Sequence, residues 1–105
     1  EVVVDGVAAR HWTDVTRKMT GRTIPHNESA LIGSVLAPGE AGAMLTITDA
    51  DNGTETWKHA GRVALHVCYC SVFGNCWTTT VKDLNTGKPA TVESSACPVD
   101  DEVIF

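Results

Sequence analysis

The sequence predicts an α+β fold, mainly an antiparallel β-sheet built as a meander of hairpins, with one short N-terminal helix and stabilising disulfides. Three observations support this class. Turn signals divide the second half of the chain into short β-prone segments, a helical apolar pattern precedes them, and four cysteines occur in 105 residues. A chain of this length is expected to form a single domain, 1–105, whose modest core gains from covalent links.

The N-terminal part is expected to form a short strand and then a helix. Three valines occupy positions 2–4, and Gly6 ends this strand. Within 7–19, apolar residues recur at helical spacing, although the threonines among them favour a strand. We expect a helix there, with Gly21 at its C-cap position.

From residue 43 onward, the pattern is typical of strands joined by tight turns. Apolar and polar residues alternate over 45–48, and Asn52-Gly53 is a strong hairpin signal, so a return strand is expected at 55–59. The remaining strands are expected at 62–72, 76–83, 90–93 and 102–105.

The cysteine-rich hairpin has a face pattern that fixes its register. If Cys70 lies opposite Cys76, then Tyr69 pairs with Trp77, and one face becomes apolar enough to cover a core. The residues of that face are Val63, Leu65, Val67, Tyr69, Trp77, Thr79 and Val81. The opposite face carries Cys68, Cys70, Cys76 and His66.

Two disulfides are the favoured interpretation of the four cysteines. This register predicts a cross-strand Cys70–Cys76 bond and leaves Cys68 to pair with Cys97. Cys68–Cys76 with Cys70–Cys97 stays open if the register shifts, whereas a bond between two residues of one strand, Cys68 and Cys70, is strained. Disulfides persist in oxidising compartments, so the expected location is the periplasm, the cell surface or the medium.

A metal site is the alternative for the same face. His66, Cys68, Cys70 and Cys76 offer one imidazole and three thiolates, which suit zinc or cuprous copper. Their spacing, H-x-C-x-C-x5-C, differs from the paired C-x2-C knuckles of zinc ribbons. Under the disulfide interpretation no cofactor is expected.

Charge and hydropathy exclude several classes of protein. The net charge of −5 argues against a nucleic-acid binder, which needs clustered basic residues. No apolar run approaches the roughly 18 residues of a membrane span. No catalytic motif is present, so the chain is not expected to be an enzyme. Because it begins with Glu1, we expect a processed chain or an excised part of a longer one.

The predicted function is therefore non-catalytic binding or assembly outside the cytoplasm. Trp57, with Lys58 and His59 beside it, could form a platform for a protein surface or a glycan. The β-prone ends, 2–4 and 103–105, could pair with each other or offer an edge for strand-mediated association. The alternatives are the metal-binding domain and an accessory periplasmic domain of a larger membrane-anchored enzyme.

Overall fold

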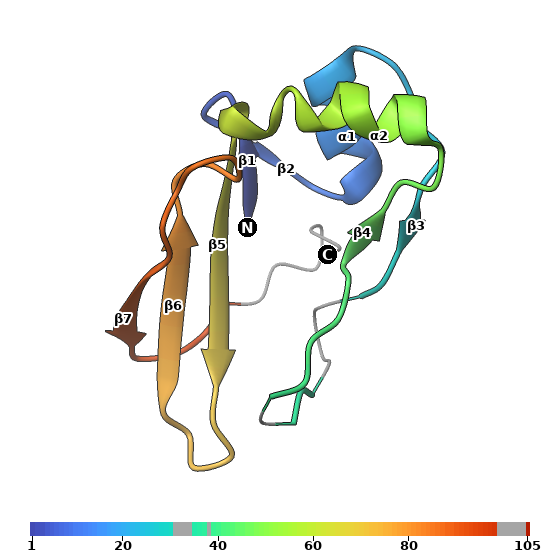
Figure 1. The fold of residues 1–105 in the computed structure, drawn as a ribbon. Helices are drawn as coiled ribbons and strands as arrows, with labels where there is room; N and C mark the ends of the chain where they lie inside the picture. The colour runs from blue at the N-terminus through green and yellow to red at the C-terminus, as the bar shows by residue number, and fades with distance from the viewer. Residues whose placement is uncertain (31–34, 38, 99–104) are drawn as a thin grey trace.

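The computed structural model describes residues 1–30, 35–37, 39–98 and 105. A five-stranded antiparallel sheet forms one side of the molecule, two short helices lie at one end of that sheet, and a two-stranded sheet lies across from it (Figure 1). The large sheet has the spatial order β2 (Val7–Ala9), β1 (Val2–Val4), β5 (Val63–Cys70), β6 (Cys76–Val81) and β7 (Ala90–Ser94). The predicted fold class is confirmed.

The other elements are short. Helix α1 covers Trp12–Thr20, helix α2 covers Ala50–Trp57, and a single 3-10 turn, η1, covers Ala60–Arg62. The small sheet pairs β3 (Asn27–Glu28) with β4 (Leu45–Thr46). None of the helices in the described part of the chain is long and apolar enough to cross a membrane.

The N-terminal strand is the first half of a tight hairpin. Asp5 and Gly6 form its two-residue turn with φ values of 52° and 78°, the backbone that Asp-Gly pairs favour in twisted hairpins. Residues 7–9 are therefore a strand, and the helix expected within 7–19 begins only at Trp12. Strand β1 pairs with β2 on one side and β5 on the other, so it leaves no edge for association. Of the other predicted terminal strand, 103–105, only Phe105 belongs to the described residues.

Helix α1 has both of its ends capped by side-chain or backbone groups. The Asp14 N–H donates to His11 Nδ1 at 3.1 Å, which satisfies one of the free amides of the first turn. Gly21 adopts a φ of 78° and donates its N–H to the Arg17 carbonyl at 2.7 Å, so the C-cap prediction is confirmed.

The hairpin predicted at residues 45–59 is wrong, because residues 50–57 form α2 instead. The Asp49 carboxylate accepts the Asn52 N–H at 2.9 Å as an N-cap, and the Gly53 N–H donates to the Asp49 carbonyl at 2.8 Å. This cap makes Asn52-Gly53 part of the first helical turn, where the pair cannot form a strand connection.

The register of the cysteine hairpin agrees with the sequence. Cys70 lies opposite Cys76 and Tyr69 opposite Trp77, with 5.9 Å between the two aromatic ring centroids. The apolar face, however, is fully covered only at its helix end, where Val63 is buried, while Tyr69 is 47% exposed. The reason is that α1 and α2 lie over one end of the sheet alone (Figure 1).

The main core lies between α1 and the start of the large sheet. Trp12 packs edge-to-face against Phe105, with 5.1 Å between their ring centroids. The buried members of this core are Val2, Val4, Ala9, Trp12, Val15, Met19, Val63 and Phe105.

Candidate functional site

An apolar cavity of about 420 Å³ lies between the two helices, β4 and the start of β5. Its volume falls in the range of about 300–1,000 Å³ that is typical of ligand sites. The side chains are almost all apolar, and the residues that line it are Trp12, Val15, Met19, Met44, Leu45, Ile47, Gly53, Thr56, Trp57, Ala60, Val63, Leu65 and Leu84.

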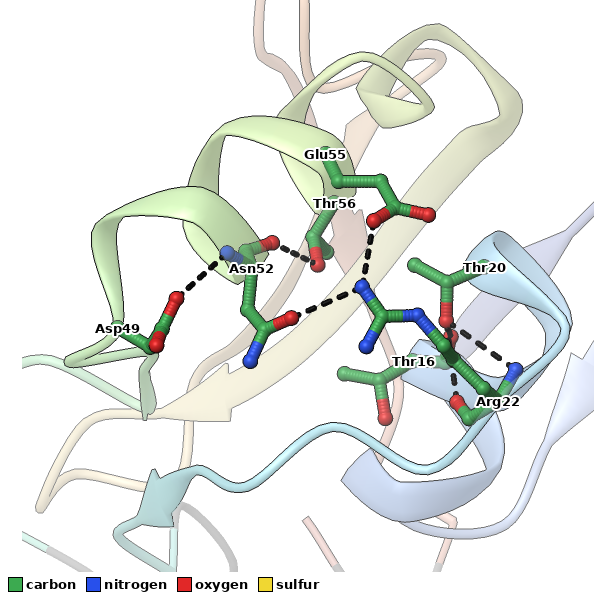
Figure 2. Close-up of polar contacts among 7 residues, drawn as sticks. All are labelled: Thr16, Thr20, Arg22, Asp49, Asn52, Glu55 and Thr56. Atoms are coloured by element: carbon green, nitrogen blue, oxygen red, sulfur yellow. Dashed lines mark hydrogen bonds and ion pairs between the residues drawn. The ribbon is translucent and has the colours of Figure 1, made fainter.

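Arg22 fixes the two helical walls of the cavity relative to each other. It follows α1, and its Nη2 donates to Asn52 Oδ1 at 2.9 Å and to the Glu55 carboxylate, both on α2 (Figure 2). Thr20 Oγ1 in turn donates to the Arg22 carbonyl at 3.0 Å. This bridge joins the segment after α1 to α2, the two helices between which the cavity lies.

Arg62 holds the end of α1 to the β1–β2 turn. Its Nε donates to both Asp5 carboxylate oxygens, at 2.9 and 3.0 Å, and its Nη1 donates to the Met19 carbonyl at 3.2 Å. The hydrogen bonds from Arg62 lower the pKa of Asp5 below its usual value. The cavity wall formed by Met19 is thus tied to the sheet.

Trp12, whose side chain lines the cavity, also carries a buried polar group. The residue is buried, and its Nε1 has no acceptor among the parts of the chain that the structure describes. A buried donor without a partner costs folding free energy.

The predicted platform of Trp57, Lys58 and His59 does not form as one surface. Trp57 ends α2, is 60% exposed and lines the cavity. Lys58 is the exposed C-cap residue of α2, and the His59 ring is engaged by Arg62, with 3.0 Å between His59 Nδ1 and Arg62 Nη1. Only Trp57 of the three belongs to the cavity. The other cavity residues come from separate segments, and no local pattern in the sequence links them.

The cysteines form two neighbouring disulfides. Cys68 is bonded to Cys97 and Cys70 to Cys76, with Cα–Cα distances of 5.5 and 4.0 Å. Cys70 Sγ lies 3.6 Å from Cys97 Sγ, so the two bonds lie side by side.

The predicted metal ligands are not brought together as a set. Among the described residues, the ligand atoms that lie within 4.8 Å of one another belong to Cys70, Cys76 and Cys97. His66 is engaged elsewhere, with its Nδ1 3.2 Å from Thr80 Oγ1 and its Nε2 3.8 Å from a Glu1 carboxylate oxygen. Sulfur atoms bonded in disulfides are also not the thiolates that zinc or cuprous copper needs.

The turn between β5 and β6 carries a second notable surface, which we call the hairpin tip (residues 71–75). Val72 and Phe73 are 94% and 87% exposed there. The turn is well ordered by its own hydrogen bonds, since the Ser71 N–H donates to the Asn75 carbonyl at 2.7 Å and the Gly74 N–H donates to the Ser71 carbonyl at 3.1 Å. The strand predicted at 62–72 ends at Cys70, so Ser71 and Val72 belong to the turn, and no sequence pattern indicated the exposure of Val72 and Phe73.

No family model matches this chain, and no curated protein or solved structure is significantly similar to it.

Proposed function

We propose that this chain is a non-catalytic extracytoplasmic binding domain whose cavity receives an apolar side chain of a protein partner. The observation that carries the proposal is the 420 Å³ apolar cavity with the exposed Trp57 in its wall. An aromatic side chain beside a preformed apolar pocket is typical of residues that dominate binding energy in protein interfaces.

The chemistry of the wall favours a protein partner over a glycan. Most lining residues offer methyl, methylene or aromatic groups, which bind apolar groups and leave sugar hydroxyls without hydrogen-bond partners. The two disulfides support the oxidising location, because such bonds are rare in reducing compartments.

The two methionines of the chain provide a direct test. Met19 and Met44 are the only methionines in the sequence, and both line the cavity. Labelling their methyl groups with ¹³C gives two NMR signals that both report on cavity occupancy. We expect both signals to shift saturably with N-acetylphenylalaninamide, which carries an aromatic side chain and peptide carbonyls, and to stay unchanged with maltotriose.

Two exposed positions supply the matched variants. Trp57→Lys removes the aromatic wall and is expected to weaken binding of the phenylalanine derivative at least tenfold. Val92→Lys on β7 changes a residue of similar exposure, 64%, far from the cavity lining, and is expected to leave binding unchanged. Methionine signals that respond to neither probe would contradict the proposal, and a response to the sugar alone would identify a glycan binder.

A further inference from the structure

The hairpin tip is suited to insert its apolar side chains into an apolar site on another molecule. The Cys70–Cys76 disulfide closes the turn, and the Phe73 N–H donates to Ser71 Oγ at 3.2 Å, so the backbone is ordered before any binding. A preordered turn loses little conformational entropy when it is bound. Its two large apolar side chains, Val72 and Phe73, contact almost nothing in this chain.

The tip and the strand segments that lead into and out of it carry no charged side chain. Between Val67 and Val81 the sequence contains no Asp, Glu, Lys or Arg. Insertion into an apolar site would therefore not strip water from an ionised side chain, which is the largest desolvation cost that proteins meet.

The cavity between α1 and α2 is large enough to hold the apolar side chains of the hairpin tip. An apolar cavity of about 150 Å³ holds a benzene molecule, so 420 Å³ accommodates the Phe73 ring and leaves room for Val72.

The tip cannot reach the cavity of its own copy. Val63, at the start of β5, lines the cavity, while Cys70 ends the strand, and an eight-residue strand separates its ends by roughly 23 Å. Figure 1 shows the β5–β6 turn at the opposite end of the molecule from α1 and α2.

We propose that the partner is a second copy of this chain, whose hairpin tip inserts Phe73 into the cavity between α1 and α2. This inference rests on the proposed function of the cavity and names its partner. Because the tip and the cavity lie at opposite ends, two antiparallel copies can exchange both tips in a closed dimer, and copies that point the same way make a head-to-tail contact, which leaves a free tip and a free cavity at the ends of each assembly. Such contacts generate open chains unless the rotation between copies closes a ring.

Sedimentation velocity over a range of protein concentrations tests the association. We expect the parent protein to form dimers and longer species as concentration rises. Phe73→Ser and Trp57→Lys should each weaken association at least tenfold, whereas Val92→Ser should not change it. All three positions are exposed, and unchanged thermal unfolding will show that the variants fold. A parent protein that stays monomeric, or association that Phe73→Ser leaves intact, overturns the inference.

A mixing experiment separates this inference from the proposed function. Methyl-labelled Phe73→Ser protein has an intact cavity but no aromatic tip, and it is mixed with unlabelled parent protein. We expect the Met19 and Met44 signals to shift on addition of parent protein and to stay unchanged on addition of unlabelled Phe73→Ser protein. Signals that respond to N-acetylphenylalaninamide but not to parent protein overturn the second copy as partner and leave the proposed function standing. Signals that respond to neither overturn both.

Discussion

Trp12 has two opposing effects on the stability of the fold, through different parts of one side chain. Its ring packs against Phe105, while its indole N–H is buried without an acceptor among the described residues. The ring therefore stabilises the fold, whereas the buried N–H costs folding free energy.

Substitution of Trp12 should separate these two contributions. Trp12→Phe removes the unpaired N–H along with part of the ring, so we expect unfolding free energy within about 1 kcal/mol of the parent. Trp12→Ala removes the whole ring and should cost about 3–5 kcal/mol. Urea denaturation measures both. A loss above about 2 kcal/mol in Trp12→Phe would show that the N–H has an acceptor in the folded protein.

Asp5 should contribute stability that depends on pH. Hydrogen bonds from Arg62 lower the pKa of its carboxyl group, so the folded state holds the ionised form more strongly than the unfolded state does. This contribution is complete above the ordinary aspartate pKa of about 3.9 and is lost as pH falls through the lower folded value. We expect the difference in melting temperature between parent and Asp5→Asn to be largest near neutral pH and to shrink in acid.

Asn is the matched replacement at position 5, because it tolerates the positive φ of 52° as Asp does. A difference in melting temperature that stays constant down to pH 2 would show that the ion pair with Arg62 does not stabilise the fold.

At the scale of elements, the cap at Asp49 decides between helix and hairpin for residues 50–57. The carboxylate accepts the Asn52 N–H, and the resulting helix supplies Thr56 and Trp57 to the cavity. We expect Asp49→Ala to cost about 1 kcal/mol of unfolding free energy, the usual effect of removing an N-cap side chain. Asp51→Ala, an exposed change in the same turn, should cost less. Equal losses in the two variants would argue against the cap.

Local patterns predicted the elements that local contacts determine. The register of β5 with β6 followed from the alternation of residues, and Gly21 marked the end of α1. Asn52-Gly53 was wrongly predicted to form a hairpin turn, because the side chain of Asp49, three residues before Asn52, caps a helix there. Asp5-Gly6 is also a hairpin signal, and its turn was not predicted because the apolar residues that follow it recur at helical spacing.

The cavity could not be predicted in this way. Its walls come from α1, α2, β4 and β5, whose contacts are set by tertiary packing, including the bridge from Arg22 to Asn52 and Glu55. Trp57 was identified only because an exposed tryptophan beside polar neighbours is a common binding residue. The exposure of Tyr69 was also missed, since the sequence does not reveal how much of the sheet the helices cover.

At the scale of the whole molecule, the two disulfides should differ in their effect. The Cys68–Cys97 bond spans a sequence separation of 29 and the Cys70–Cys76 bond one of 6. On the chain-entropy model these loops are worth about 3.6 and 2.4 kcal/mol. We expect the double variant Cys68→Ser/Cys97→Ser to lose about 1 kcal/mol more in urea denaturation than Cys70→Ser/Cys76→Ser. A larger loss in the second variant would contradict this ranking.

The pairing of β1 with β5, a strand far away in the sequence, has a consequence for the order of folding. The β1–β2 and β5–β6 hairpins join neighbouring segments, whereas Val2 pairs with Leu65 across more than half of the chain. Non-local strand pairing is slow compared with hairpin formation. We expect the two hairpins to form early and the pairing between β1 and β5 to form last. Until β1 pairs with β5, the N-terminal hairpin stays free of the rest of the sheet.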